Sequence, residues 1–374
     1  MKAMILAAGK GTRVQPLTYD MPKPMIPVLG KPVMETIVEQ LARHGIRDIM
    51  VNVSHLGYRI EQYFGDGRRL GVNIGYSFEG YLDEDEIVPQ PVGSAGALRR
   101  IQDFGGFFDT TTVVLCGDAI VDLDFGAALA EHRRRRARAS VITLRVPMES
   151  VSSYGVVGTD FDGRVVSFQE KPSRAAARSD CVSTGIYILE PDVIDMIPRG
   201  RPFDIGSELF PLLVERGVDF YAQLHSFNWI DIGKVSDYWR VIMSMMRRPA
   251  AGLSMPGHQS IEGIWTGLNT SIDWRGTSIR GPVYIGSGAR IEAGCRIEGP
   301  VWIGHGCHVG AGARVSQCVL FEYARVGAGA LLEDAIVSGR YCVNKHGDAL
   351  LASEPGTAWR WGDARAAGVR ARAA

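Results

Sequence analysis

The first half of the chain alternates short apolar runs with segments in which apolar residues recur at helical spacing. The apolar runs predict buried strands, and the periodic segments predict amphipathic helices. The predicted strands are Lys2–Ala7, Asp48–Val53, Val72–Phe78 and Thr112–Cys116, and the predicted helices are Val33–His44, Tyr58–Phe64 and Ser94–Ile101. Strands that alternate with helices predict an α/β domain with a mostly parallel sheet. In such a sheet, ligands bind beyond the carboxyl ends of the strands.

A different period governs the chain from Ile279 onward. A branched aliphatic residue recurs every sixth position: Ile279, Ile285, Ile291, Ile297, Ile303, Val309 and Val315. A small or β-branched residue follows each of the first six after four positions: Val283, Ala289, Cys295, Val301, Cys307 and Ala313. The phase slips near Phe321 and resumes weakly at Val326 and Leu332. A hexapeptide repeat of this kind predicts a parallel β-helix.

These two patterns divide the chain. We expect a catalytic domain over 1–246, a Pro- and Gly-punctuated linker over 247–276, a β-helix over 277–340 and a C-terminal extension over 341–374. The last residues are rich in Ala and Arg, and we expect this end to fray.

Composition removes several classes of function. The 374 residues include 41 Lys+Arg and 41 Asp+Glu, so the formal net charge is zero, which argues against a nucleic-acid or anionic-membrane binder. No apolar run approaches the ~18 residues that span a bilayer. The opening Met1–Ala8 is too short for a signal peptide. The six cysteines form no Cys-x-x-Cys pair, which indicates neither a zinc site nor a disulfide framework. We therefore expect a cytoplasmic protein with reduced thiols.

A glycine-rich loop follows the first predicted strand. It reads Leu6-Ala7-Ala8-Gly9-Lys10-Gly11-Thr12-Arg13, and its small residues let the backbone approach a ligand and expose amides to an anion. The loop is neither a Walker A motif nor a dinucleotide fingerprint, because Val14 stands where the third glycine of the fingerprint would be. Arg13 and Lys23 bring two cations to this region, as a triphosphate site requires.

The loop and its continuation, LAAGKGTRVQPLT…PKPMIPVLGKP, resemble the signature of the nucleoside-diphosphate-sugar pyrophosphorylases, the sugar-1-phosphate nucleotidyltransferases. Further segments resemble motifs of that family in the family's order: Gly93–Leu98, Cys116–Asp118, Tyr154–Val157, Phe168–Pro172, Ser183–Tyr187 and Trp229–Gly233. The resemblance covers about residues 1 to 245 and is greatest to the bacterial mannose-1-phosphate guanylyltransferases. It implies a Rossmann-like, glycosyltransferase-A-like mixed sheet, and the tail resembles the left-handed β-helix that many members append.

The reaction implied by the resemblance is NTP plus sugar 1-phosphate giving NDP-sugar plus pyrophosphate, with GTP and mannose 1-phosphate as substrates. The phosphate nucleophile has a second pKa near ~6, so it needs no general base at neutral pH. Catalysis then consists of positioning and charge neutralisation. By resemblance, Arg13 and Lys23 are the catalytic cations, and Asp118 and Asp231 hold Mg²⁺.

The resemblance also assigns binding residues. Those expected to hold the nucleotide are Leu6, Ala7, Ala8, Gly9, Gly11, Thr12, Gly93 and Ser94. Those expected to hold the sugar phosphate are Gly155, Glu170, Lys171, Ser183 and Thr184.

Alternatives remain open at this point. Ser183 stands where the guanylyl branch has Asn, and an acidic insertion at 82–86 precedes the base-contacting segment. Glucose 1-phosphate with UTP, dTTP or ATP is the alternative substrate pair. A non-catalytic sensor of nucleotide sugars is the alternative from another class. A short β-helix also exposes aliphatic ends, which predicts a homo-oligomer contact.

Overall fold

The computed structural model describes residues 1–83, 86–250 and 253–366. The chain forms two compact units. The first comprises Met1–Gly11, Asp20–Ile26 and Pro32–Ile230, and the second comprises Thr12–Tyr19, Pro27–Lys31 and the chain from Asp231 onward. Each unit is described by itself below.

The first unit is built on a nine-stranded sheet with the order β12-β11-β13-β8-β1-β4-β5, to which β10 and β14 add beside β13. The strands are β1 (Lys2–Leu6), β4 (Asp48–Val53), β5 (Asn73–Phe78), β8 (Thr112–Cys116), β10 (Ala139–Arg145), β11 (Gly155–Thr159), β12 (Val165–Glu170), β13 (Cys181–Leu189) and β14 (Phe220–Leu224). β1 pairs in parallel with β4 and β8, and β4 pairs in parallel with β5. β13 runs antiparallel to β8 and makes the sheet mixed. The predicted α/β class, with a mostly parallel mixed sheet, is confirmed.

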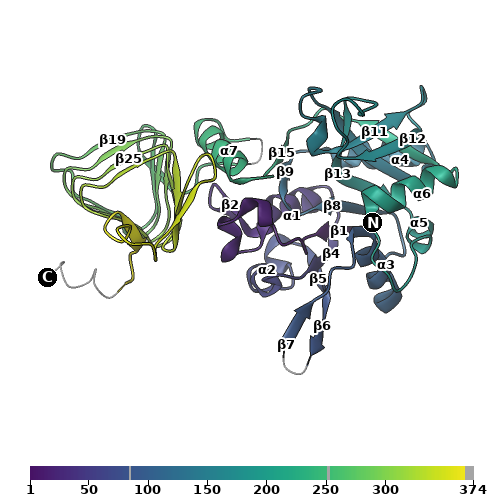
Figure 1. Cartoon of the computed structure of the whole chain (residues 1–374), viewed down its shortest axis with the longest axis horizontal. Coiled ribbons are helices and arrows are strands. Elements are labelled where there is room, and N and C mark those ends of the chain that lie inside the picture. The colour runs from purple at the N-terminus through teal and green to yellow at the C-terminus, as the bar shows by residue number, and fades with distance from the viewer. Residues whose placement is uncertain (84–85, 251–252, 367–374) are drawn as a thin grey trace. The chain divides into compact units, whose positions relative to one another are not determined.

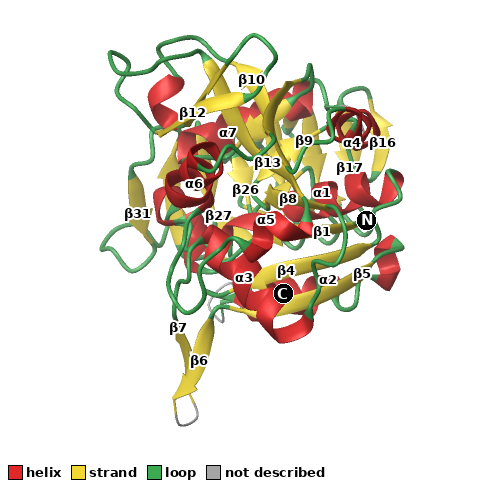
Figure 2. Ribbon diagram, turned by 90° about the vertical axis from the view of Figure 1, so that its right-hand side faces the viewer, coloured by secondary structure: helices red, strands yellow, loops and turns green. Residues whose placement is uncertain are grey.

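Helices cover both faces of this sheet (Figure 2). They are α1 (Val33–Arg43), α2 (Gly57–Phe64), α3 (Ser94–Gly105), α4 (Phe125–Arg134), α5 (Pro191–Asp195) and α6 (Phe210–Glu215). Ala3 and Ile5 of β1 join a core with residues of α1, α2 and α4, while Met4 joins a second core with residues of α3, α5 and α6. Successive residues of a strand face opposite sides, so β1 contributes to both cores.

Shorter strand pairs accompany the main sheet. A hairpin of β6 (Gly80–Asp83) and β7 (Glu86–Pro89) projects from the first unit (Figure 2). Of the acidic insertion at 82–86, Glu84 and Asp85 lie outside the described residues. β9 (Ala119–Val121) pairs with β15 (Trp229–Asp231), and β2 (Pro27–Val28) with β3 (Lys31–Pro32).

The second unit contains α7 (Val235–Arg247) and a parallel β-helix with a triangular outline (Figure 1). One side holds β17 (Ile264–Thr266), β20 (Val283–Ile285), β23 (Val301–Ile303), β26 (Val319–Leu320) and β29 (Ala335–Val337). A second holds β18 (Ser271–Ile272), β21 (Arg290–Ile291), β24 (His308–Val309) and β27 (Ala324–Val326). The third holds β19 (Ser278–Arg280), β22 (Arg296–Glu298), β25 (Arg314–Ser316) and β28 (Leu331–Glu333).

The predicted inward residues fill the β-helix core, with the cysteines and alanines of the repeat between the aliphatic side chains. The phase slip also has a structural form: Ile303 aligns with Leu320, so Leu320 and not Phe321 continues the inward row. The first coil, with β17 and β18, lies in the segment that the sequence assigned to the linker.

The far end of the β-helix is covered. β30 (Tyr341–Asn344) and β31 (Ala349–Leu351) add antiparallel to β29, and β32 (Trp361–Asp363) adds antiparallel to β27. Trp361 is buried against the core. The expectation that this end exposes aliphatic side chains is therefore wrong for the C-terminal coil, because the extension covers it.

Candidate active site

The glycine-rich loop begins where three parallel strands end. Leu6 of β1 aligns with Asn52 of β4 and with Cys116 of β8. The buried Ala7 donates its backbone N–H to Asn52 Oδ1 at 2.8 Å, and the Gly117 N–H donates to the Leu6 carbonyl at 2.9 Å. The loop is therefore fixed from both neighbouring strands.

Small residues leave the outer part of this loop open. A Cβ on Gly9 would meet no atom within 4 Å, whereas a Cβ on Gly117 would lie 3.0 Å from Ile5 Cγ2 and 3.2 Å from the Leu6 carbonyl oxygen. Gly11 has a φ of 63°, in the left-handed region that favours glycine. A ligand can thus approach the backbone at Gly9.

Lys23 and Asp118, a predicted cation and a predicted metal ligand, lie together. Lys23 begins a 3₁₀ turn (Lys23–Met25), and Asp118 follows Gly117 at the end of β8. The Lys23 ammonium forms an ion pair with Asp118 Oδ2, with 11% of the lysine and 28% of the aspartate side chain exposed. Each of the two charges is therefore balanced by the other.

The side chains around Asp118 determine which metal ion its carboxylate could bind. Within the described ranges, no three His, Cys, Asp or Glu side chains gather as a metal centre. Mg²⁺ usually takes only one or two protein carboxylates, with phosphate oxygens and water completing its shell. The partly exposed carboxylate of Asp118 therefore fits a magnesium ion that is shared with a nucleotide.

Gly93 and Ser94 form the start of α3. The Ser94 hydroxyl donates to Asp204 Oδ2 and accepts from the Ile205 N–H, both at 2.8 Å. Burial alone would raise the pKa of Asp204, but hydrogen bonds from Ser207, Ser94 and Gly206 outweigh burial and hold that pKa below its ordinary value. The Ser94 side chain therefore locks this segment onto the chain around Asp204.

The predicted sugar-phosphate residues Gly155 and Glu170 pair across β11 and β12. A Cβ on Gly155 would lie 2.4 Å from Cζ of Phe168, so a larger residue there would require the ring to move. Lys171 donates from Nζ to Glu170 Oε1 at 2.6 Å, and both side chains are exposed. This pair is open to a phosphate and to sugar hydroxyls.

Ser183 and Thr184 lie on β13 and are buried. The Ser183 hydroxyl accepts from the Gly185 N–H at 3.3 Å, and the Thr184 hydroxyl donates to the Ile142 carbonyl at 2.9 Å. Thr184 thus supports the irregularity in the β10–β13 pairing between Val141 and Thr143.

Three predicted residues belong to the second unit. Thr12 and Arg13 lie on a 3₁₀ turn (Thr12–Val14) whose Val14 is buried, and both are exposed. Asp231 is half-buried at the end of β15, and a Cβ on Gly233 would lie 3.5 Å from its Oδ2. The partnership of Asp231 with Asp118, and that of Arg13 with Lys23, stay predictions.

Sequence reasoning missed three polar residues that hold the candidate loops: Asn52, Glu79 and Asp204. Asn52 and Glu79 are 3% and 6% exposed. For these two a signal was present: Asn52 is a polar residue inside the apolar strand run Asp48–Val53, and Glu79 directly follows the run that ends at Phe78. Buried polar groups of this kind require hydrogen-bond partners.

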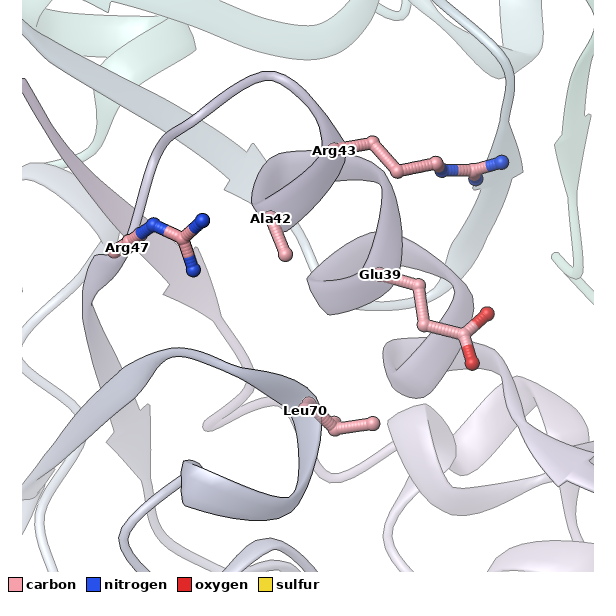
Figure 3. A pocket seen from close by; sticks show the side chains of 5 residues that line it. All are labelled: Glu39, Ala42, Arg43, Arg47 and Leu70. Atoms are coloured by element: carbon pink, nitrogen blue, oxygen red, sulfur yellow. The ribbon is translucent and has the colours of Figure 1, made fainter.

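A surface pocket of about 420 Å³ lies elsewhere in the first unit (Figure 3). It is lined by Glu39, Ala42 and Arg43 of α1, by Arg47 before β4 and by Leu70 before β5. Arg47 and Leu70 precede their strands, so the pocket lies at the amino edge of the sheet, opposite the candidate loops. It is not part of the candidate active site.

The sheet, the glycine-rich loop and the paired charges agree with a nucleotidyltransferase, and the comparison with known families shows this class. The model of the nucleotidyl transferase family matches residues 2–248, and the model of the GMPPB C-terminal domain matches residues 279–347. The chain belongs to the nucleotidyl transferase family and is close to the sugar-1-phosphate nucleotidyltransferases. Among the described residues, no helix has the length and apolarity to cross a membrane.

Relatives extend along both units. The chain is 52% identical over 372 residues to a UTP–glucose-1-phosphate uridylyltransferase of Synechocystis, covering 100% of this chain and 96% of the relative. It is 32% identical to a mannose-1-phosphate guanylyltransferase of Mycobacterium tuberculosis, over 88% of this chain and 82% of the relative. A crystal structure described as a putative glucose-1-phosphate thymidylyltransferase of Bacillus anthracis matches with a TM-score of 0.57 at 26% identity, over 69% of this chain and 100% of that one.

Proposed function

We propose that this protein transfers a uridylyl group from UTP to glucose 1-phosphate, giving UDP-glucose and pyrophosphate. The observation that carries the choice of substrates is the 52% identity, along the whole chain, to a UTP–glucose-1-phosphate uridylyltransferase. Ser183, at the position where the guanylyl branch has Asn, agrees with a sugar other than mannose.

The reaction is an in-line displacement at phosphorus. A phosphate oxygen of glucose 1-phosphate attacks the α-phosphorus of UTP, and the bond from that phosphorus to the bridging oxygen of the β-phosphate breaks. The nucleophile is already ionised at neutral pH, so no side chain has to remove a proton. The protein must therefore position two anions and neutralise the charge that accumulates on the leaving pyrophosphate.

The open backbone at Gly9 supports placing the UTP phosphates over the Leu6–Gly11 loop, with the base near Gly93 and Ser94. Lys23, which is paired with Asp118 after the neighbouring strand β8, would neutralise the phosphate charges together with Arg13. Asp118, with Asp231, would hold Mg²⁺, which when bound draws charge from the phosphate oxygens. The ion pair of Lys23 with Asp118 keeps both groups oriented until the nucleotide arrives.

The exposed pair of Glu170 and Lys171 would receive the sugar phosphate. Lys171 supplies a cation for the phosphate, and Glu170 accepts hydrogen bonds from sugar hydroxyls. The Phe168 ring packs over Gly155 on this strand pair, so a side chain at position 155 would displace the ring. Ser183 and Thr184 complete the wall of the sugar site in this proposal.

The second candidate is the transfer of a guanylyl group from GTP to mannose 1-phosphate. It is favoured by the match of the β-helix to the GMPPB C-terminal domain and by the 32% identity to a mannose-1-phosphate guanylyltransferase. Both candidates use the same chemistry and differ in base and sugar recognition.

The test is a matrix of UTP, GTP, dTTP and ATP against glucose 1-phosphate and mannose 1-phosphate, with Mg²⁺ and a pyrophosphate-release assay. We expect the highest kcat/KM for UTP with glucose 1-phosphate. A maximum for GTP with mannose 1-phosphate would establish the second candidate instead. No turnover with any pair would contradict the enzymatic function and favour a nucleotide-sugar sensor.

A further inference from the structure

A chain of buried hydrogen bonds runs beneath the glycine-rich loop of the first unit. Ala7 donates its N–H to Asn52 Oδ1 at 2.8 Å, and Asn52 donates from Nδ2 to Glu79 Oε1 at 2.6 Å. All three residues are buried: Ala7, Asn52 and Glu79 are 4%, 3% and 6% exposed. The Asn52 side chain thus accepts a hydrogen bond from the loop through its oxygen and donates one to Glu79 through its nitrogen. These two bonds fix the orientation of the amide.

Glu79 connects this chain to the second nucleotide-binding segment. It follows β5 and continues the strand pairing, since its N–H donates to the Val53 carbonyl at 2.8 Å. Burial raises the pKa of Glu79 above its ordinary value, and the Asn52 amide, the Val92 backbone and the charge of Arg100 offset only part of this rise. The Glu79 carbonyl accepts the Gln90 N–H at 3.1 Å. Glu79 therefore contacts Asn52 through its side chain and the segment before Gly93 through its backbone.

Val92 is the residue before Gly93 and Ser94. Its carbonyl accepts the Phe203 N–H at 2.9 Å, and the Phe203 carbonyl accepts the N–H groups of Ala95 and Gly96 at 2.9 and 2.8 Å. The backbone around Gly93 is therefore held by Phe203 and, through Gln90, by Glu79. The glycine-rich loop and the start of α3, which are far apart in the sequence, are joined through Asn52 and Glu79.

We propose that Asn52 and Glu79 are positioning residues that hold the Leu6–Gly11 loop and the Val92–Ser94 segment at one fixed separation, and that this separation sets the affinity for the NTP. The inference rests on the proposed function, because it takes these two segments to hold the nucleotide. Neither side chain needs to touch the nucleotide, since each is buried behind the backbone that it holds. Loss of the connection should weaken NTP binding and leave binding of the sugar phosphate unchanged.

The test compares three variants with the wild type. Asn52→Ala removes both bonds of the amide. Asn52→Asp keeps an acceptor for the Ala7 N–H but sets two carboxylates against each other. The double variant N52D/E79Q reverses the bond between the two side chains, because the introduced glutamine amide would donate to the introduced carboxylate.

The matched control is Asn73→Ala. Asn73 also lies at the end of a strand of this sheet, but it begins β5 at the amino edge, opposite the candidate loops. Its amide donates to the exposed Asp48 at 2.9 Å. The control therefore removes an asparagine side chain and a hydrogen bond from the same sheet without touching the connection between the two nucleotide-binding segments.

We expect the KM for UTP to rise about tenfold or more in the two single variants, where tenfold corresponds to about 1.4 kcal/mol. The KM for glucose 1-phosphate should stay within about twofold, and the double variant should recover most of the UTP affinity. The control should match the wild type. An unchanged KM for UTP in folded N52A, or equal loss for both substrates, would overturn the proposal. If N52A does not fold, the comparison of N52D with N52D/E79Q decides, and absence of recovery overturns it.

A binding measurement separates this proposal from the proposed reaction. Calorimetric titration of UTP and of GTP, each with Mg²⁺, into the wild type and the variants needs no turnover. If the wild type binds a nucleotide without turning it over, the proposed reaction fails and the positioning role is still tested by the affinities. If the wild type catalyses the proposed reaction but the variants bind UTP as tightly as the wild type, the positioning role is contradicted and the proposed reaction is not.

Discussion

Gly93 occupies a backbone conformation that its replacement would not tolerate. Its φ of 76° and ψ of 159° fall in a region that is essentially restricted to glycine. A Cβ at this position would lie 2.5 Å from the Phe203 carbonyl oxygen. That oxygen accepts the N–H groups of Ala95 and Gly96, so a shift of Phe203 would weaken two hydrogen bonds at the start of α3. We predict that Gly93→Ala destabilises the first unit and impairs nucleotide binding.

The size of the effect follows from these contacts. The conformational strain costs about 1–3 kcal/mol, and overpacking against backbone costs a further ~1–3 kcal/mol. Alanine also restricts the unfolded chain, which offsets about 0.4–1 kcal/mol of this. The expected loss in free energy of unfolding is therefore on the order of 1–6 kcal/mol.

The assay is urea denaturation followed by far-UV circular dichroism, together with the KM for each substrate. Gly105→Ala is the matched control, because Gly105 ends the same helix and a Cβ there meets no atom within 4 Å. The control should be neutral or stabilised by up to about 1 kcal/mol. If G93A unfolded within about 0.5 kcal/mol of the wild type with an unchanged KM for UTP, the assigned conformation of Gly93 would be refuted.

Three further predictions concern other parts of the chain. Asp118→Asn should lower kcat about 10²- to 10³-fold, measured by pyrophosphate release over a Mg²⁺ titration, and full activity at any Mg²⁺ concentration would exclude a metal role. Burial lowers the pKa of His132 below its ordinary 6.5 despite the neighbouring Glu190, so the unfolded chain binds the proton more readily. The free energy of unfolding should therefore fall as the pH drops below about 6.5, and it should fall less in His132→Gln. The measurement is the urea midpoint of both proteins at pH 7 and pH 5. An equal fall in the two proteins would exclude a contribution of this histidine. Burial raises the pKa of the β-helix thiols Cys307 and Cys318 to about 12, so both should resist iodoacetamide in the native protein and react in urea, and native labelling detected by mass spectrometry would contradict their inward placement.

Periodicity alone located seven elements in the first 116 residues and the repeat of the β-helix. The repeat from Ile279 to Val315 specified the inward row of the β-helix because each coil repeats the same local requirement, a branched side chain facing the axis. The predicted strand over Asp48–Val53 has the same bounds in the structure, and the helix predicted from Val33 ends at Arg43, one residue before the expected His44. A local sequence pattern is sufficient to predict an element where contacts between residues close in the sequence determine its structure.

The contacts that hold the candidate site together could not be predicted from local sequence patterns. Asn52 meets Ala7 only because β1 and β4 pair in a particular register, and Glu79 meets Gln90 only because the chain returns after the β6–β7 hairpin. The ion pair of Lys23 with Asp118 likewise joins residues 95 positions apart. Motif resemblance suggested roles for these two charges, but their contact depends on the folded sheet.

The central claim is the choice of UTP and glucose 1-phosphate by a nucleotidyltransferase, and a competition tests it most directly. Equimolar UTP, GTP, glucose 1-phosphate and mannose 1-phosphate are incubated with the protein and Mg²⁺, and the nucleotide sugars formed at low conversion are quantified by mass spectrometry. The account predicts that UDP-glucose is the dominant product. Dominant GDP-mannose, or no nucleotide sugar at all, would contradict it.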